Sequence, residues 1–157
     1  MRTQLVRSTD PILRIKAKPI TEFGGKNSAK ISALIVGMYG LMRRQNGIGI
    51  AAPQVGRSVR LIIVSAPSDT FQTPKNLFMC NPEIVARSKE MVDSVEGCLS
   101  LPGKYFLVKR HKVISVKYQD VKGDWQVATG DGMFAVVAAH EIDHINGILM
   151  SDVGVPA

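Results

Sequence analysis

The sequence is poor in cysteine and has no long hydrophobic run, and both absences limit the classes of protein that it can represent. Two cysteines in 157 residues cannot build a disulfide framework, so we expect a protein of a reducing compartment. The longest mainly apolar stretch, Ile31 to Met42, is interrupted by Ser32 and two glycines and is too short to span a bilayer. The first residues, MRTQLVRSTDPILRIK, contain no apolar segment of the kind that a secretory signal needs. We therefore expect a cytoplasmic protein without a membrane partner.

Acidic residues are also scarce relative to basic ones. The chain has 20 Lys and Arg against 13 Asp and Glu, which gives a formal net charge of +7. Such a charge can serve a polyanionic partner such as a nucleic acid or the ribosome, or it can be an undirected solubility charge. The scatter of the charges along the chain favours the second interpretation, so we expect no specific nucleic-acid ligand. The length suits one domain with a single core, and we expect residues 1–157 to form one monomeric catalytic domain.

Two segments have the pattern of helices. Residues 28–45 have apolar side chains at the i, i+3, i+4, i+7 spacing and predict an amphipathic helix near the N-terminus, ended by Asn46-Gly47. Residues 131–145, DGMFAVVAAHEIDHI, are apolar on nearly every face. They predict a helix buried in the middle of the domain and ended by Asn146-Gly147.

The remaining patterns indicate strands. VRLIIVSA (residues 59–66) predicts a buried strand, and VISVKYQDVKGDWQVAT (residues 113–129) predicts a hairpin that turns at Lys122-Gly123. GIGIAAPQVG (residues 47–56) is too rich in Gly and Ala for an ordinary strand, and SDVGVPA (residues 151–157) has the composition of a frayed end. The chain is therefore expected to be an α+β domain, in which mostly antiparallel strands pack around the central helix that contains HEIDH.

HEIDH has the spacing of a helical metal site. His140 and His144 are four residues apart, so both imidazoles lie on one face of a helix and can point at one ion. Glu141 lies about 100° around the helix and can reach a water on that ion without binding the ion itself. The alternative is a solvated face of unrelated polar residues, but the preceding FAVVAA turn is apolar, and polar groups there need partners.

A catalytic metal of this type needs a third protein ligand. The extended pattern H-E-x-x-H-x-x-G-x-x-H is matched as far as Gly147, but its last position is Met150, whose thioether is too weak a ligand for a hydrolytic zinc. The chain ends soon afterwards, so the ligand must lie upstream. His111 stands in the basic stretch VKRHK, and Cys80 stands among apolar neighbours, where most cysteines are inert. Cys98, next to a glycine and before a Pro-Gly turn, is favoured, and a plain core cysteine is the alternative.

Three motifs, taken together, resemble those of the peptide deformylases. GIGIAAPQ (residues 47–54), EGCLS (residues 96–100) and HEIDH (residues 140–144) stand in that family's order and at similar separations. DPILRIKAKPI near the N-terminus and LVKR after the cysteine motif are also similar, so the resemblance covers nearly the whole chain. The activity that it implies is removal of the formyl group from the initiator methionine of nascent proteins, with release of formate.

The resemblance implies a complete metal site. Cys98, His140 and His144 become the ligands of a metal that is usually Fe²⁺ in this family, with Zn²⁺, Ni²⁺ or Co²⁺ as substitutes. A water would occupy the fourth position, and the metal would lower its pKa so that hydroxide attacks the formyl carbon. Glu141 becomes the general base and acid, while the Gln54 amide and the backbone N–H of Leu99 stabilise the oxyanion.

The resemblance also assigns substrate contacts. The backbone at Ile48, Gly49 and Gly97 is expected to pair with the formyl-methionyl peptide as an added strand. Ile48 is further expected to line the methionine pocket together with three residues of the helix that contains HEIDH: Met133, Val136 and Val137. Ordinary core packing predicts the same side chains, so the two interpretations remain open. A transient contact with the ribosome is expected from the activity.

The sequence departs from the family pattern at several positions. Ala139 stands where a glutamine commonly precedes HExDH, Tyr105 stands where many members have arginine, and the C-terminus is short. None of these positions is a proposed ligand, base or oxyanion donor. Glu96 and Arg110 are expected to form an ion pair that fixes the cysteine loop, and Asp143 to orient a ligand or to cap the surface.

Two other functions remain as alternatives. A zinc peptidase acting on ordinary amides would use the same helix motif, although Met150 and the short tail count against it. A structural zinc held by Cys80, Cys98, His140 and His144 would suit a basic RNA-binding module. However, the two cysteines are far from the compact spacing of such sites, and Glu141 would have no role. Replacing Glu141 by Gln separates the enzyme from the structural site.

Overall fold

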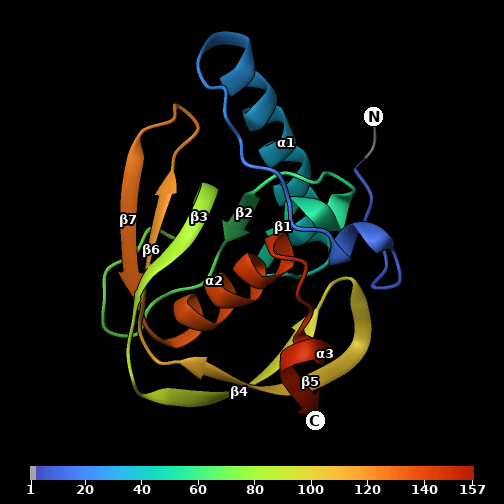
Figure 1. The fold of residues 1–157 in the computed structure, drawn as a ribbon, viewed down its shortest axis with the longest axis vertical. Coiled ribbons are helices and arrows are strands. Elements are labelled where there is room, and N and C mark those ends of the chain that lie inside the picture. Colours follow the sequence, from blue (N-terminus) through green and yellow to red (C-terminus); the bar gives the residue numbers. More distant parts are fainter. Residues whose placement is uncertain (1–2) are drawn as a thin grey trace.

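The computed structural model describes residues 3–157 and consists of two antiparallel sheets and a central helix. The five-stranded sheet has the order β1-β2-β3-β6-β7, with bounds Gly49–Ala51, Leu61–Val64, Leu77–Arg87, Ile114–Gln119 and Trp125–Gly130. The three-stranded sheet has the order β4-β5-β8, with bounds Met91–Cys98, Leu101–His111 and Gly154–Pro156. Figure 1 shows α2 in the middle of the molecule, with β6 and β7 on one side and β4 and β5 below it. The expected α+β class with mostly antiparallel strands is confirmed.

The central helix α2 spans Gly132–Ile145 and is apolar over most of its surface. Its side chains join those of the five-stranded sheet in one core cluster, in which Phe134 and Ile145 are fully buried. Asp131 directly precedes the helix, and its carboxylate accepts hydrogen bonds from the Ser68 and Thr70 hydroxyls at 2.6 and 2.7 Å. This anchors the first turn of α2 to the loop between β2 and β3.

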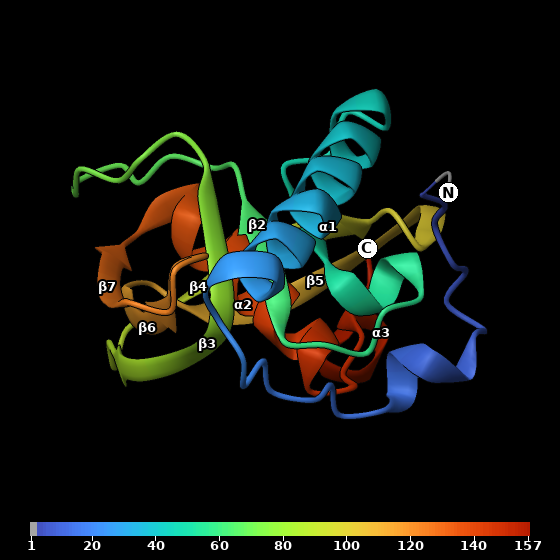
Figure 2. The ribbon, with the colours of Figure 1, turned by 90° about the horizontal axis from the view of Figure 1, so that it is seen from above.

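The N-terminal helix α1 spans Gly25–Arg44 and packs one face on the strands beside it. The buried face consists of Ile31, Ile35, Met38, Leu41 and Met42. Asn46, which follows the helix, has a φ of +56°, a left-handed conformation that an α-helix cannot continue through. Figure 2 shows α1 crossing over β2. Among residues 3–157, no helix is both long and apolar enough to cross a membrane.

Two expectations about short segments are wrong. Gly49–Ala51 forms the strand β1, which pairs with β2, because the hydrogen bonds of a ladder come from the backbone and do not need large side chains. At Gly49 an added Cβ would clash with its neighbours. The C-terminal segment is ordered as helix α3 (Met150–Val153) and strand β8, which pairs with β5 through Val155 and Leu107. Two 3₁₀ turns complete the fold: η1 (Pro11–Arg14) and η2 (Ala52–Val55).

Candidate metal centre

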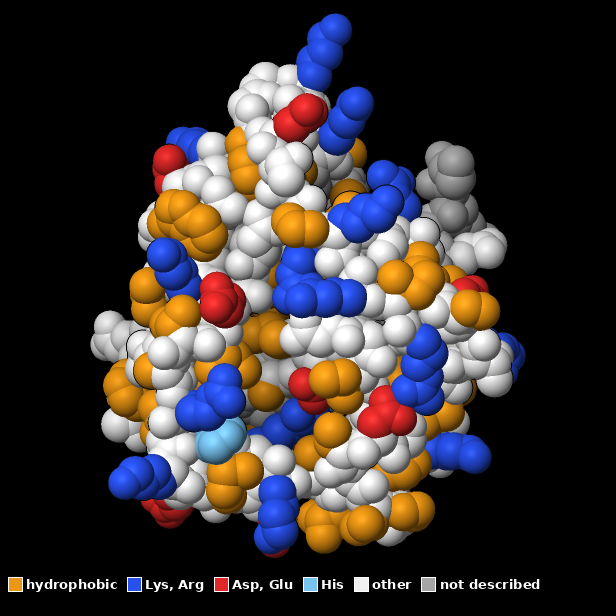
Figure 3. Space-filling model, in the orientation of Figure 1, with side chains coloured by type: hydrophobic (Ala, Val, Ile, Leu, Met, Phe, Trp, Pro, Cys, Tyr) orange, Lys and Arg blue, Asp and Glu red, His pale blue; other side chains and the backbone are white. Residues whose placement is uncertain are grey.

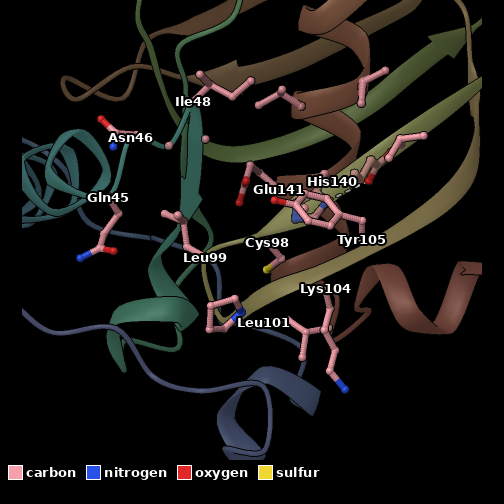
Figure 4. A pocket seen from close by; sticks show the side chains of 18 of the residues that line it. Gln45, Asn46, Ile48, Cys98, Leu99, Leu101, Lys104, Tyr105, His140 and Glu141 are labelled. Carbon is pink, nitrogen blue, oxygen red and sulfur yellow. Dashed lines mark hydrogen bonds and ion pairs between the residues drawn. The ribbon is translucent and has the colours of Figure 1, made fainter. Parts of the chain in front are cut away.

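Three soft or borderline donors from two elements lie together at the centre of the molecule. His140 and His144 project from α2 with ring centroids 5.0 Å apart, and Cys98 ends β4 with its Sγ 3.3 Å from His144 Nε2. One donor atom from each residue lies within 4.8 Å of the others. Ligands of one tetrahedral ion at ordinary Zn–N and Zn–S lengths are about 3.3–3.6 Å apart, so these three residues fit one ion. Figure 4 shows Cys98, His140 and Glu141 around the same pocket.

The orientation of His140 is fixed by a buried ion-pair relay. Its Nδ1 donates to Glu96 Oε1 at 2.9 Å, so Nε2 is the nitrogen left for a metal. Glu96 in turn accepts two hydrogen bonds of 2.8 Å from Arg110, which also donates to Asp143 at 2.7 Å. The predicted Glu96–Arg110 pair is therefore present, and Asp143 contacts Arg110 rather than a ligand.

The electrostatics of this relay favour a cation beside the histidines. Burial opposes ionisation of Glu96, but hydrogen bonds from Arg110 and His140 lower the pKa of its carboxyl to about 2. Burial alone would lower the pKa of His140, yet hydrogen bonds with Cys98 and Glu96 raise it to about 10. Burial and the neighbouring His140 lower the pKa of His144 to about 3. The same acceptors that stabilise a proton on His140 would stabilise a metal ion that takes its place at Nε2, and His144 keeps a free lone pair for the ion.

Two buried polar atoms at the site have no hydrogen-bond partner within residues 3–157. These are His144 Nδ1 and Glu141 Oε2. Since an unsatisfied buried polar group is costly, Glu141 Oε2 points to a ligand or a water at the site, whereas His144 Nδ1 is not the ring nitrogen that faces Cys98. Burial raises the pKa of Glu141 to about 7, against the opposing charge of His140. A carboxyl group with a pKa near neutrality can both accept and donate a proton.

The Gln54 amide is held with its nitrogen towards Cys98. Gln54 lies in η2, and its Oε1 accepts from the backbone N–H of Ala51 at 2.9 Å. Its Nε2 donates to Ser100 Oγ at 3.3 Å and lies 3.6 Å from Cys98 Sγ. Leu99 lies in the turn that follows β4, where Cys98 pairs with Leu101, so its N–H is outside the ladder. The tertiary fold therefore places both expected oxyanion donors beside Cys98.

A cavity of about 540 Å³ opens over these groups. Its lining includes all six residues expected to bind substrate: Ile48, Gly49, Gly97, Met133, Val136 and Val137. Gly49 is tightly enclosed, because a Cβ there would lie 2.6 Å from Val137 Cγ1 and 2.7 Å from Glu141 Oε1. The cavity combines apolar walls with a small number of polar groups, as binding sites for small ligands do.

Other candidate ligands lie elsewhere. His111 lies at the end of β5, where its Nδ1 contacts the Ser88 carbonyl oxygen at 2.7 Å. Cys80 is fully buried in the core beneath α1, and burial raises the pKa of its thiol to about 12. Within residues 3–157, the cluster of possible metal ligands contains neither residue. A four-ligand structural zinc with Cys80 is therefore contradicted.

The sequence reasoning missed some residues of the site. Ser100, 2% exposed, receives a hydrogen bond from Gln54 and stands inside the EGCLS motif that pointed to Cys98. Ser94 and Val95 line the cavity on β4, and they lie just outside the EGCLS motif, so no motif indicated them. Of the departures from the family pattern, Ala139 packs against the core behind the site and Tyr105 lines the cavity.

Comparisons with known proteins agree with this geometry. The family model described as polypeptide deformylase matches residues 3–156. A peptide deformylase of Desulfotalea psychrophila is 43% identical over 143 residues, which cover 91% of this chain and 82% of that protein. The class I type b peptide deformylase from Acinetobacter baumannii, solved with Met-Ala-Ser bound, has a TM-score of 0.87 and 33% identity, with 98% of both chains covered. A probable peptide deformylase from the Synechococcus phage S-SSM7 has a TM-score of 0.85 and 36% identity over 96% of this chain and 99% of that one.

Proposed function

The chain belongs to the peptide deformylase family and is a metal-dependent hydrolase that removes the formyl group from N-formyl peptides, and from this premise we propose the role of each residue of the site. Cys98, His140 and His144 hold the metal. The observation that supports this most directly is the convergence of their donor atoms within 4.8 Å. The Glu96 contact to His140 supports it further, because carboxylates that accept from the second nitrogen of a histidine orient metal ligands.

The proposed physiological metal is Fe²⁺, with Zn²⁺, Ni²⁺ or Co²⁺ as substitutes. One thiolate and two imidazoles accept any of these borderline ions. When bound, the ion supplies Lewis acidity and makes a water nucleophilic at neutral pH. The thiolate also makes the site sensitive to oxidation, so the protein needs anaerobic handling.

Glu141 is the proposed proton carrier. It accepts a proton as water attacks the formyl carbon and delivers a proton to the departing amine of methionine. It is only 4% exposed, and this burial raises the pKa of its carboxyl to about 7, which suits both halves of this transfer. Val137 and the enclosed Gly49 limit the space that the carboxyl can move in.

Gln54 and Leu99 are the proposed oxyanion donors. The amide nitrogen of Gln54 and the backbone N–H of Leu99 would donate to the formyl oxygen as negative charge develops on it. The bond from Ala51 to Gln54 Oε1 supports this role, because it keeps the amide nitrogen turned towards Cys98 before substrate arrives. Preorganised donors of this kind stabilise a transition state without having to reorient.

The proposed natural substrate is an N-formyl-methionyl nascent peptide. Its backbone would pair with Ile48, Gly49 and Gly97 as an added strand. Its methionine side chain would lie among Ile48 and the three apolar α2 residues that line the cavity: Met133, Val136 and Val137. The Met-Ala-Ser bound to the relative from Acinetobacter baumannii supports a methionyl peptide as the occupant. We further propose that residues 1–157 act as one cytoplasmic, monomeric domain that contacts the ribosome transiently.

The test is formate release from formyl-Met-Ala-Ser by protein purified anaerobically with Fe²⁺. The wild type is expected to release formate rapidly, whereas Glu141→Gln should lose at least about 10²-fold in kcat because proton transfer is removed. Glu90→Gln, at a carboxylate that is 66% exposed and pairs only with Lys112, is the matched control and should retain full activity. Metal content and circular dichroism should be equal in all three proteins. A metal-loaded wild type that releases no formate would refute the proposed substrate.

A further inference from the structure

A second cavity, of about 490 Å³, lies between α2, the second half of β3 and the last residues of β5. The helix α2 turns a different side to each cavity, since Ala139, Ile142 and Asp143 line this one and none of them lines the substrate cavity. Within residues 3–157, no residue lines both cavities. The volume is that of an ordinary site for a small molecule, and the proposed function gives this cavity no role.

The second cavity has apolar walls and an excess of positive charge. Its apolar lining consists of Pro82, Ile84, Met91, Ile114, Ala139 and Ile142. Its basic residues are Arg60, Arg87, Lys109 and Arg110, its acidic residues are Glu83 and Asp143, and it also contains His111. Figure 3 shows Lys and Arg side chains and one histidine beside a hollow on this face of the molecule. The lining therefore suits a ligand that is apolar over most of its surface and negatively charged at one end.

Arg110 is the buried cation of this cavity. Its side chain is 8% exposed, and it lines this cavity but not the substrate cavity. A guanidinium has five N–H donors, and the structure shows acceptors for three of them: two on Glu96 and one on Asp143. The other two N–H groups have no acceptor within residues 3–157. Since a buried donor without a partner is costly, an oxygen atom in this cavity would be stabilised beside Arg110.

Arg87 is a second cation without a partner. It is exposed at the end of β3, and within residues 3–157 no carboxylate forms an ion pair with it. The other basic residues of the lining are engaged. Lys109 pairs with Asp93 at 3.2 Å, and Arg60 donates to the carbonyl oxygen of Ile145 at 3.0 Å. An incoming anion therefore meets uncompensated positive charge at the mouth of the cavity.

We propose that this cavity binds a small organic acid, with its carboxylate on Arg110 and its apolar body against Ile114 and Ile142. A carboxylate can accept two hydrogen bonds from one guanidinium, and these bonds are stronger than neutral ones because both partners are charged. The apolar walls add affinity only for a ligand with an apolar body, which distinguishes such an acid from inorganic phosphate. The neighbouring carboxylate of Asp143 also repels a doubly charged anion more strongly than a singly charged one.

The experiment is a titration of the ¹⁵N-labelled, Zn²⁺-loaded protein with cyclohexanecarboxylate, followed by NMR. Saturable shifts are expected for the backbone amides of Ile84, Ile114 and Asn146, with a Kd on the order of 1 mM, as is ordinary for a ligand of this size. The amides of Gly49 and Gly97 in the substrate cavity should not shift. Saturable shifts at these two glycines alone would place the probe at the metal and overturn the proposal, as would the absence of any saturable shift.

Two further ligands separate the charge of the probe from its apolar body. Cyclohexanecarboxamide has the same shape without the charge, so it is expected to bind at least about 10-fold more weakly. Inorganic phosphate carries the charge without the apolar body and should produce no saturable shift at the same amides. Equal binding of the amide and the acid, or binding of phosphate as tight as that of the acid, would overturn the proposed ligand class.

A larger side chain at Ala139 should fill the cavity. Ala139→Gln is expected to abolish the saturable shifts, and since glutamine is common at this position in the family, the variant should fold and keep its metal. Ala29→Gln, at an exposed position of α1 outside the cavity lining, is the matched control and should bind like the wild type. Circular dichroism and metal content establish that both variants are intact. Undiminished binding in Ala139→Gln would overturn the proposal.

Removal of the cation at the mouth tests the same site without a change in the core. Arg87→Gln is expected to raise the Kd of cyclohexanecarboxylate about 2- to 5-fold, as the loss of one exposed charge does. Arg43→Gln, at an exposed arginine of α1 outside the lining, is the matched control and should leave the Kd unchanged. Equal effects of the two substitutions would show that only the net charge of the protein attracts the acid, and would overturn the role of this cavity.

Discussion

At the scale of single residues, Gly49 shows how closely β1 approaches Glu141, the proposed proton carrier. A Cβ at this position would lie 2.7 Å from Glu141 Oε1 and 2.6 Å from Val137 Cγ1, closer than nonbonded atoms approach. Glu141 is buried, so its carboxyl cannot turn towards solvent to make room. The absent side chain at Gly49 therefore leaves the space that the carboxyl of Glu141 occupies.

Gly49→Ala is expected to lower kcat/KM for formyl-Met-Ala-Ser by about 10²-fold, because displacing a catalytic group by about 1 Å has that effect. Metal content should stay at the wild-type level, since the atoms nearest to the added Cβ belong to Val137 and Glu141 and not to a proposed ligand. Gly40→Ala is the control, because its added Cβ meets only the flexible tip of Arg44. Steady-state kinetics with metal analysis test this, and full activity in Gly49→Ala would show that Glu141 needs no fixed position.

The sequence could predict ligands only where local geometry determines them. The spacing of His140 and His144 defines one helix face, whatever the rest of the fold does. Cys98 is 42 positions upstream of His140 and was favoured by its glycine and turn neighbours and by the family resemblance. The contact of Asp143 with Arg110 and that of Gln54 with Ser100 depend on the packing of distant elements. No spacing in the sequence specifies such contacts.

At the scale of elements, strands with strong local patterns were predictable and strands defined by their neighbours were not. β6 and β7 alternate around a compact turn and were expected as a hairpin. β1 and β8 have three residues each and form because β2 and β5 offer ladder partners. β4 and β5 were obscured because they expose apolar side chains, Val95 and Leu107 among them, on the face that normally shows polar residues.

The connection between α2 and the three-stranded sheet depends on the buried guanidinium of Arg110. This side chain, 8% exposed, joins Glu96 on β4 to Asp143 on α2, and Glu96 in turn contacts His140, a proposed metal ligand. Removing one partner of a buried ion pair leaves the others uncompensated. The relay therefore contributes both to the stability of the fold and to the geometry of the metal site.

Arg110→Met is expected to lower the free energy of unfolding by about 3–5 kcal/mol and to weaken metal binding about 10- to 100-fold. The neighbouring Lys109→Met is the matched control, because Lys109 and its partner Asp93 are 76% and 59% exposed. Exposed pairs of this kind contribute at most about 1 kcal/mol. Urea denaturation and competition with a chelator measure the two effects. Equal behaviour of the two variants would mean that the relay is dispensable.

At the scale of the whole molecule, the two sheets depend on the same helix. One side of α2 belongs to the core cluster of the five-stranded sheet, where Phe134 and Ile142 pack. Its histidines face Cys98 at the end of β4, so a metal bound there ties the helix to the three-stranded sheet. Neither sheet can separate from α2 without losing its part of the core or the metal site. This arrangement favours a single cooperative unit, as the length of the chain already indicated.

Cooperative unfolding can be followed with one probe in each sheet. Trp125 is the single tryptophan and lies on β7 of the five-stranded sheet, whereas Cys98 ends β4 of the three-stranded sheet. In the Co²⁺-substituted protein, urea is expected to abolish the thiolate-to-metal absorption and to change the Trp125 fluorescence with one common midpoint. A lower metal concentration should move both midpoints down together, since an ion that binds only the folded state stabilises all of it equally. If the absorption disappears at a clearly lower urea concentration than the one that changes Trp125, the three-stranded sheet opens by itself, and residues 1–157 do not act as one domain.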